Sequence, residues 1–316
     1  MFKTIIICGF LACVLVVFAW VFVNNSKIEG ITSPLPIFLT RIVNSSVTTL
    51  DLWIPQKNVK ESSLKKPDVS ARSALMYDIT TGQLLYAKNI DEKLPLASLT
   101  KIMTAVIALE NRTENDTYYV DKSALVGEDS MGLTEGEALT LKELLYGLFL
   151  VSGNDAAEVL AWNYQYGRKG FLDAMNNKAR SLGLSDTHFT NPSGLEGDGN
   201  QYTTAYDLLV ISRYAIVRFP LFNEVVGTVD IELPYSKFHK YFYLQNETNL
   251  LTSYSGVKGV KAGFTPEAGL CLVTYYEGQG HKIIGVVLGS NNRRDDMKGM
   301  LDYSLKLQGI KVPKHD

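Results

Sequence analysis

Three short segments hold residue types that together suit nucleophilic attack on a peptide carbonyl without a histidine. Ser98-Leu99-Thr100-Lys101 places a hydroxyl three residues before an amine, and Ser152-Gly153-Asn154 adds a second hydroxyl and an amide. Lys261-Ala262-Gly263 adds a cation beside a glycine. The segments are 54 (152 − 98) and 109 (261 − 152) residues apart, so only tertiary folding could bring them together.

Ser98 and Lys101 are the first candidate pair. A helix that begins at or just before Ser98 places its hydroxyl near the free amide hydrogens of the first turn and puts Lys101 on the same face. Nearly all other residues of this helix are apolar, so we expect Lys101 to be buried. Burial lowers the pKa of an ammonium, and the neutral amine can then accept the serine proton. The alternative is that Ser98 only caps the helix while Lys101 extends to water.

The other two segments also have structural alternatives. Ser152 and Asn154 fall between two predicted helices, where polar side chains can point into a cleft. The alternative is a helix C-cap at Gly153 followed by an N-cap at Asn154 or Asp155. Gly263 lies on a predicted strand and allows a ligand to approach the backbone closely, whereas the alternative is a β-bulge or a bend.

The pattern of apolar residues predicts an α+β fold, with one antiparallel β-sheet packed against a cluster of helices. Strand patterns occur at both ends of the globular part and helical patterns lie between them. The predicted strands are residues 73–78, 83–88, 257–264, 270–277 and 282–289. The predicted helices are residues 98–110, a helix from 140 that breaks at Gly153, then 156–166, 168–182, 204–218 and 295–307.

Cap and turn residues set several of these boundaries. Thr140 with Glu143 three residues later is typical of a capping box. Gly183 is expected to stop the helix before it. Gly278-Gln279-Gly280 is expected to join the last two strands as a hairpin.

The composition excludes several classes of function. The 316 residues are 46% hydrophobic and 20% charged with a net charge of −2, so there is no basic surface for nucleic acid. The 4 histidines lack metal-ligand spacing and cysteine partners, and we expect neither a metal nor a cofactor. Cys271 stands among apolar residues and is expected to be a buried hydrophobe rather than a nucleophile.

The chain divides into three predicted parts. Residues 5–23, from Ile5 through Val23, are uncharged and mostly apolar, which is long enough for a membrane-spanning helix. The run ends without a convincing cleavage site, so residues 1–23 are predicted to be an uncleaved membrane anchor, with a long signal peptide as the alternative. Residues 24–65 are predicted to be a tether, and residues 66–316 a single globular domain.

The order Ser-x-x-Lys, Ser-x-Asn, Lys-x-Gly resembles the motif set of the penicillin-binding proteins. The resemblance is closest to the low-molecular-mass members, which are serine-type D-alanyl-D-alanine carboxypeptidases. It extends through residues 95–105, 191–195, 202–208, 256–273 and 285–289, and covers about residues 70–307. It implies a β-lactamase/DD-peptidase-like fold and a domain on the extracytoplasmic side of the cell membrane, which residues 5–23 would cross once.

The resemblance implies roles for the catalytic candidates. Ser98 would attack the carbonyl between two D-alanines and hold the acyl-enzyme. Lys101 would be the base that activates it, and Ser152 and Asn154 would complete the hydrogen-bond network and the proton path.

Further residues are implied in substrate binding. Lys261 would supply positive potential, and the backbone amides of Ser98 and Phe264 would form an oxyanion hole. Arg293 would help hold the terminal carboxylate, although the adjacent Arg294 also fits, and a solvated helix start is the alternative for both. The substrate-binding candidates are Lys261, Gly263, Phe264, Thr265 and Arg293.

One residue departs from the family pattern. Ala262 stands where the family usually has threonine, which removes a hydroxyl expected to bind the substrate carboxylate. A neutral hydrogen bond contributes on the order of 1 kcal/mol, so we expect weaker binding rather than lost chemistry. Thr265 is not expected to replace that hydroxyl, because odd and even positions of a strand point to opposite faces.

The predicted function is therefore that of a membrane-tethered serine DD-carboxypeptidase. It would remove the terminal D-Ala from peptidoglycan stem peptides through an acyl-enzyme, with β-lactams as covalent inhibitors. The alternatives are a DD-endopeptidase or a β-lactamase on the same fold, or a catalytically weakened peptidoglycan-binding protein. A class A β-lactamase would need a deacylating glutamate after the second motif, and no convincing candidate is present at a suitable spacing.

Overall fold

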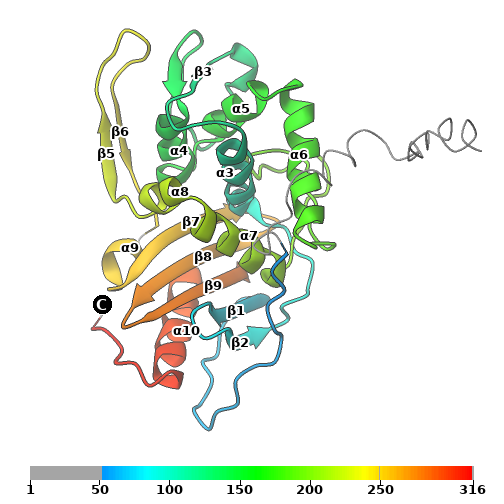
Figure 1. The fold of residues 1–316 in the computed structure, drawn as a ribbon, viewed down its shortest axis with the longest axis vertical. Coiled ribbons are helices and arrows are strands. Elements are labelled where there is room, and N and C mark those ends of the chain that lie inside the picture. The colour runs from blue at the N-terminus through cyan, green and yellow to red at the C-terminus, as the bar shows by residue number, and fades with distance from the viewer. Residues whose placement is uncertain (1–51, 249, 315–316) are drawn as a thin grey trace, which may run out of the picture. The chain divides into compact units, whose positions relative to one another are not determined.

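A computed structural model of the chain describes residues 52–248 and 250–314 (Figure 1). The predicted anchor at residues 5–23 lies outside these residues. Among the residues that are described, no helix has both the length and the apolar character needed to cross a bilayer.

The strands and helices have the following bounds. The strands are β1 (Ser73–Asp78), β2 (Gln83–Lys88), β3 (Thr117–Tyr119), β4 (Ala138–Thr140), β5 (Asp230–Leu233), β6 (Phe242–Gln245), β7 (Val257–Thr265), β8 (Gly269–Gly278) and β9 (His281–Ser290). The α-helices are α3 (Thr100–Asn111), α4 (Leu141–Leu150), α5 (Asn154–Trp162), α6 (Gly167–Ser181), α7 (Ala205–Arg218), α8 (Pro220–Val226), α9 (Leu250–Ser253) and α10 (Arg293–Leu307). In the described part of the chain the 3₁₀ turns are η1 (Ala97–Leu99) and η2 (Lys122–Ala124).

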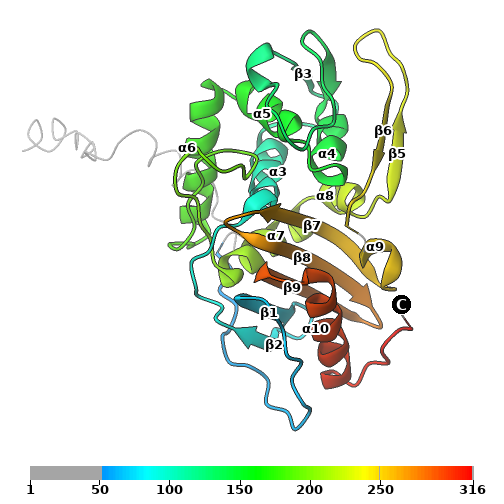
Figure 2. The same ribbon diagram turned by 180° about the vertical axis from the view of Figure 1, so that it is seen from behind.

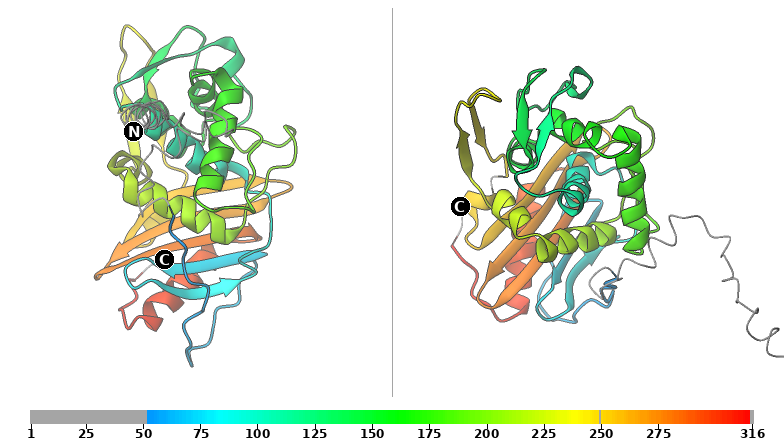
Figure 3. Two further views of the ribbon diagram at one scale, coloured as in Figure 1. Left: turned by 45° about the vertical axis from the view of Figure 1, so that its right-hand side comes forward. Right: turned by 45° about the horizontal axis from the view of Figure 1, so that its top comes forward.

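A 5-stranded antiparallel sheet in the order β2-β1-β9-β8-β7 forms the base of the fold. Helix α10 covers one face, in front of the sheet in Figure 2, and α7 and α8 cover the other. Helices α3 to α6 form a second half beyond the β7 edge (Figure 3). The predicted α+β architecture, with strands from both ends of the sequence and helices between them, is confirmed.

Strand periodicity explains why both faces of the sheet are covered. Every residue of β1 is buried, and neighbouring side chains enter different cores. Leu75 and Tyr77 pack with the helical half, whereas Ala74 and Met76 pack with α10. Side chains alternate between faces along a strand, so a strand buried on both faces is apolar throughout.

The locally determined boundaries agree with the sequence analysis. The Thr140 hydroxyl accepts a hydrogen bond from the Glu143 amide, and the Glu143 carboxylate accepts one from the Thr140 amide, so the predicted capping box is confirmed. Gly183 follows α6 with a φ of +77°, a left-handed conformation that suits glycine. The predicted hairpin at residues 278–280 is also confirmed.

The helix predicted at residues 156–166 is shifted in the structure. Helix α5 begins at Asn154 and ends at Trp162, and Gly153 occupies the N-cap position. The prediction that Asn154 or Asp155 caps this helix from outside is wrong, because both lie inside its first turn. Tyr166 adopts a left-handed conformation with a φ of 72°, which ends helical geometry before that residue.

The described end of the predicted tether, residues 52–65, lies against the domain. Trp53 packs edge-to-face on Tyr77, with ring centroids 5.4 Å apart, and the Arg213 guanidinium lies 4.4 Å from the Trp53 ring centroid. The Tyr206 hydroxyl donates to the Pro55 carbonyl at 2.8 Å. Contact between the chain and the domain therefore begins well before β1.

Candidate active site

Ser98 lies in the η1 turn, directly before α3. Ala97 adopts a φ of +47°, which turns the chain sharply into the helix. Ser98 is 9% exposed, and its side chain makes no cap hydrogen bond to the start of either helical segment. The alternative in which Ser98 acts only as a helix cap is therefore not observed.

Lys101 lies in the first turn of α3 and is completely buried. Its Nζ lies 2.9 Å from Ser98 Oγ, 2.7 Å from Asn154 Oδ1 and 2.7 Å from the Ser193 carbonyl oxygen. The alternative in which Lys101 extends to water is excluded. Burial, and next the charge of Lys261, hold the pKa of Lys101 well below its usual value of 10.5.

The three partners of this amine are not chemically equivalent. The oxygens of Asn154 and Ser193 can only accept hydrogen bonds, so each takes one N–H of the amine. The hydroxyl of Ser98 can donate or accept. A neutral Lys101 amine that donates to the first two oxygens therefore has its lone pair directed at the Ser98 hydroxyl.

Ser152 and Asn154 enter the site from the junction between α4 and α5. Ser152 has a φ of +58°, and its hydroxyl donates to Ser98 Oγ at 3.0 Å. Ser152 is 3% exposed and Asn154 2%, so neither is an ordinary surface residue of a helix-to-helix turn. The Asn154 side-chain NH₂ donates to the Gly127 carbonyl at 3.5 Å, which leaves its oxygen facing Lys101.

The Ser193 carbonyl is brought to Lys101 by the loop at residues 191–195. Asn191 Oδ1 accepts hydrogen bonds from the amides of Ser193 and Gly194, which fixes the turn. Gly194 has a φ of +93°, and a Cβ added to it would lie 1.9 Å from the Ala97 carbonyl oxygen. Only glycine allows this loop to pack directly against the backbone before Ser98.

Strand β7 is the edge of the sheet that faces Ser98. A Cβ added to Gly263 would lie 2.9 Å from the Ser98 amide nitrogen, so the strand passes very close to that amide. Lys261 is 1% exposed and has no ion-pair or hydrogen-bond partner among the described residues. Burial lowers its pKa to about 8, although Glu247 and Asp129 act in the opposite direction.

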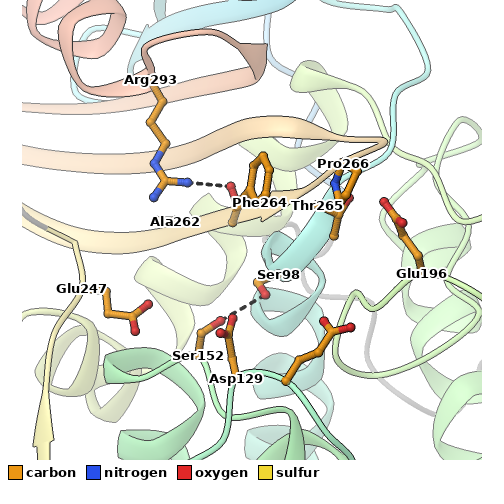
Figure 4. Close-up of a pocket in the computed structure, with 12 residues that line it drawn as sticks. Ser98, Asp129, Ser152, Glu196, Glu247, Ala262, Phe264, Thr265, Pro266 and Arg293 are labelled. Atoms are coloured by element: carbon orange, nitrogen blue, oxygen red, sulfur yellow. Dashed lines mark hydrogen bonds between the residues drawn. The ribbon is translucent and has the colours of Figure 1, made fainter.

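Arg293 reaches the same strand from the first turn of α10. Its Nη1 donates to the Gly263 carbonyl at 2.7 Å (Figure 4), and the side chain lines the cavity above Ser98. The solvated alternative for Arg293 is therefore not observed. Asp296 holds the start of this helix, because its carboxylate accepts hydrogen bonds from the amides of Ser70 and Ala71.

A cavity of about 500 Å³ opens above Ser98. Figure 4 shows Ser98 and Ser152 at its base and Arg293 on the opposite wall. The twelve residues that line it are Ser98, Glu128, Asp129, Ser152, Glu196, Glu247, Ala262, Gly263, Phe264, Thr265, Pro266 and Arg293. This arrangement can hold an extended peptide beside β7 with a carbonyl over the Ser98 hydroxyl.

Thr265 lies at the end of β7, beside the cavity. It lines the same cavity as Ala262, although the two positions differ in parity. The cavity runs along the free edge of β7 and around its end, and Thr265 is the last residue of the strand. Its hydroxyl accepts a hydrogen bond from the Ala268 amide at 3.1 Å, and the expectation that it does not replace the missing hydroxyl stays a prediction.

A family model described as D-alanyl-D-alanine carboxypeptidase matches residues 60–292, more than half of the chain. The chain belongs to this family. The D-alanyl-D-alanine carboxypeptidase DacF of Bacillus subtilis is 35% identical over 243 residues, which is 74% of this chain and 62% of that protein. The D-alanyl-D-alanine carboxypeptidase of Streptomyces sp. strain K15 is 33% identical over 266 residues, which is 78% of this chain and 91% of that protein.

Solved structures show the same fold. The crystal structure of the Streptomyces K15 DD-transpeptidase aligns with a TM-score of 0.73 and 33% identity, covering 77% of this chain and all of the solved chain. The chain spans less than two thirds of the length of the Bacillus relative.

Several residues that complete the site were missed by sequence reasoning. The Ser193 carbonyl is a backbone acceptor, which the type of a residue cannot predict, although residues 191–195, which contain it, resemble the family. Asp129, Glu196 and Glu247 line the cavity from three separate loops. Cys271, by contrast, is buried as expected, and burial raises the pKa of its thiol to about 11.

Proposed function

We propose that this protein is a serine-type DD-carboxypeptidase that removes the terminal D-Ala from peptidoglycan stem peptides. The observation that carries the proposal is the buried Lys101 amine, which contacts Ser98, Asn154 and the Ser193 carbonyl at hydrogen-bond distance. Membership of the D-alanyl-D-alanine carboxypeptidase family supports the same reaction class.

Acylation begins at the Ser98 hydroxyl. Its oxygen attacks the carbonyl carbon of the penultimate D-Ala as the proton passes to the neutral Lys101 amine. The tetrahedral intermediate then collapses, the C–N bond breaks, and the departing D-Ala nitrogen takes a proton relayed from Lys101 through Ser152. The product is an ester between Ser98 and the shortened peptide.

The negative oxygen of the intermediate is stabilised by the amides of Ser98 and Phe264. The close passage of β7 beside the Ser98 amide supports this assignment, because the carbonyl would have to lie between the two. The terminal carboxylate of the substrate would lie between Lys261 and Arg293. Lys261 has no partner among the described side chains, which leaves its charge for the substrate.

Deacylation reuses the same base. Lys101 takes a proton from a water molecule, the hydroxide attacks the ester, and Ser98 leaves with a proton restored to its oxygen. An amine in place of water would give transpeptidation, and the Streptomyces K15 protein carries names for both reactions. Hydrolysis of a cross-linked peptide would make the protein an endopeptidase by the same steps.

The location of the enzyme is part of the proposal. Residues 5–23 would cross the cell membrane once and place the catalytic domain on the extracytoplasmic side, where peptidoglycan lies. Their uninterrupted apolar character supports a spanning helix.

Labelling with a fluorescent penicillin tests the nucleophile. We expect the full-length protein to form a covalent adduct that survives denaturation, and Ser98→Ala to form none. An unlabelled parent, or equal labelling of Ser98→Ala, would reject Ser98 as the acylated residue.

Product analysis separates the alternative reactions. Incubation with a pentapeptide, a cross-linked dimer and a penicillin should release free D-Ala from the pentapeptide as the fastest reaction. Faster cleavage of the dimer would assign endopeptidase activity, and rapid turnover of penicillin would assign a β-lactamase.

A further inference from the structure

The two ends of the catalytic cavity are lined by different side chains. Arg293 donates to the Gly263 carbonyl on one side, and Glu196 lies beside Thr265 and Pro266 on the side away from Arg293 (Figure 4). In the proposed function, the terminal carboxylate of the substrate lies at the Arg293 end. The Glu196 carboxylate therefore faces a different part of the peptide.

Glu196 is fixed beside the end of β7. The Thr265 hydroxyl donates to its carboxylate, and the Glu267 amide donates to it at 2.9 Å. These two hydrogen bonds, the first more than the second, hold the pKa of Glu196 below its usual value, so the side chain is an anion at neutral pH. A carboxylate can accept about four hydrogen bonds, so acceptor positions remain for a ligand.

The loop that carries Glu196 is anchored on both sides of it. The Leu195 carbonyl accepts a hydrogen bond from the Asn191 side-chain amide at 2.8 Å. Asp198 pairs with Arg168 at 2.7 Å, whereas Glu196 has no cationic partner among the described residues. The cavity therefore holds an anion in a fixed position with its charge available, which reduces the entropic cost of binding a cation.

Two other carboxylates of the cavity act on the buried lysines. Burial lowers the pKa of Lys101 and of Lys261, and Asp129 and Glu247 both oppose that shift. These two carboxylates therefore stabilise the charged forms of the lysines. The contacts of Glu196, by contrast, are with the last residue of β7 and the turn that follows it.

The direction of the bound peptide brings one of its side chains to Glu196. In the proposed function the scissile carbonyl lies at the Phe264 amide and the leaving D-Ala points toward Arg293. The rest of the peptide then continues past Phe264 along β7, which is an edge strand. An extended peptide advances about 3.4 Å per residue. The residue before the penultimate D-Ala therefore lies beside Thr265 and Pro266, next to Glu196.

We propose that Glu196 selects stem peptides in which the residue before the D-Ala-D-Ala pair carries a free side-chain ammonium, an inference that rests on the proposed function. The ammonium donates to the remaining acceptor positions of the Glu196 carboxylate and forms a charge-assisted hydrogen bond. An amine that has been acylated in a cross-link has no charge and loses this contact. Glu196 thus directs the enzyme to stems that are not yet cross-linked through that amine.

Two soluble tripeptides test this selection. Both end in D-Ala-D-Ala after an N-terminally acetylated lysine, whose side-chain amine is free in one peptide and acetylated in the other. We expect the full-length parent, kept in detergent micelles, to cleave the free-amine peptide with a kcat/KM about fivefold higher. Both peptides are cleaved by the same steps, so the ratio of their kcat/KM values cancels any general loss of activity in a variant.

Two substitutions of Glu196 separate its charge from its role in the loop. Glu196→Gln keeps an oxygen that can accept from the Glu267 amide and removes the charge, so this variant should cleave the two peptides equally. Glu196→Lys should prefer the acetylated peptide, because like charges repel. Glu61→Gln is the matched control, since Glu61 is exposed and lies outside the cavity, and it should keep the parent ratio.

Three results would overturn the proposal. They are a parent that does not discriminate, a Glu196→Gln variant that keeps the parent ratio, and an equal loss of preference in Glu128→Gln. Glu128 also lines the cavity, so the last result would mean that its overall charge sets the preference. Cleavage of neither peptide would instead overturn the proposed function. The peptides would then be compared as competitors of penicillin labelling at Ser98, and equal protection by both would overturn the role of Glu196 as well.

Discussion

Lys101 is the residue on which the proposed chemistry depends. It is a fully buried amine with two obligate acceptors and one hydroxyl as partners, so its environment favours the neutral base. Its pKa is lowered first by desolvation and then by a second buried lysine, Lys261. The proposed mechanism therefore uses general-base chemistry without the histidine that most serine hydrolases use.

Replacing Lys101 tests this assignment. Lys101→Met removes the amine and keeps most of the volume, so we expect the rate of penicillin labelling to fall about 10³-fold because the general base is lost. Lys169→Met is the matched control, since the side chain of that lysine is 86% exposed and pairs with Asp173 on the surface. Labelling of Lys101→Met at the parent rate would show that another group activates Ser98.

Lys261 predicts a pH dependence in substrate binding. Its pKa is about 8, so it is a cation below that pH and loses its charge as the pH rises through it. Binding of a carboxylate-terminated peptide should therefore weaken above about pH 8, seen as a rising KM. Lys261→Arg keeps the positive charge, so the KM of that variant should not rise in the same pH range. A KM in the parent that is constant on both sides of pH 8 would contradict the role of the Lys261 charge.

At the scale of elements, the close approach of β7 to η1 is set by one glycine. Gly263→Ala places a Cβ 2.9 Å from the Ser98 amide nitrogen, which must shift the strand or the turn. We expect acylation by penicillin to slow about 10²-fold, the effect of losing one oxyanion donor, with the fold preserved. Acylation kinetics together with the melting temperature measure both effects.

A glycine in α10 provides the control for this substitution. Gly299→Ala adds the same methyl group, but its nearest neighbour, a Pro67 carbon, would lie 3.6 Å away, an ordinary contact. It should leave acylation unchanged and increase stability slightly, because alanine favours a helix. Equal acylation rates in Gly263→Ala and Gly299→Ala would mean that the approach of β7 is not needed for catalysis.

The elements that sequence predicted best are those set by neighbouring residues. The capping box at Thr140, the stop at Gly183 and the hairpin at residues 278–280 depend on side chains only a few positions apart. The start of α5 was misplaced because the polar side chain of Asn154 suits a cap, whereas the fold directs it to Lys101, 53 residues away. The Ser193 carbonyl and the left-handed Ala97 depend on packing between distant segments, which no local pattern encodes.

At the scale of the whole molecule, the segment before β1 contributes to stability. Trp53 packs on Tyr77 and lies under Arg213, and it is partly buried against the helical core. We expect Trp53→Ala to lower the free energy of unfolding by about 1–2 kcal/mol, measured by urea denaturation. Leu64→Ala, at a position 41% exposed in the same segment, should change it by less than about 0.5 kcal/mol. Equal values for the two variants would show that this segment does not support the domain.

Two left-handed residues flank the reacting hydroxyl, and they set a limit on engineering. Ala97 and Ser152 have φ values of +47° and +58°, and each such conformation costs a side-chain-bearing residue about 1–3 kcal/mol. Glycine in place of Ala97 would relieve the cost but also release the chain to sample other turns, whereas glycine in place of Ser152 would in addition remove the hydroxyl that relays the proton in the proposed mechanism. Selection for heat resistance would therefore favour substitutions that remove this backbone strain. Such substitutions would hold the Ser98 hydroxyl less precisely, so the most thermostable variants are not expected to be the fastest catalysts.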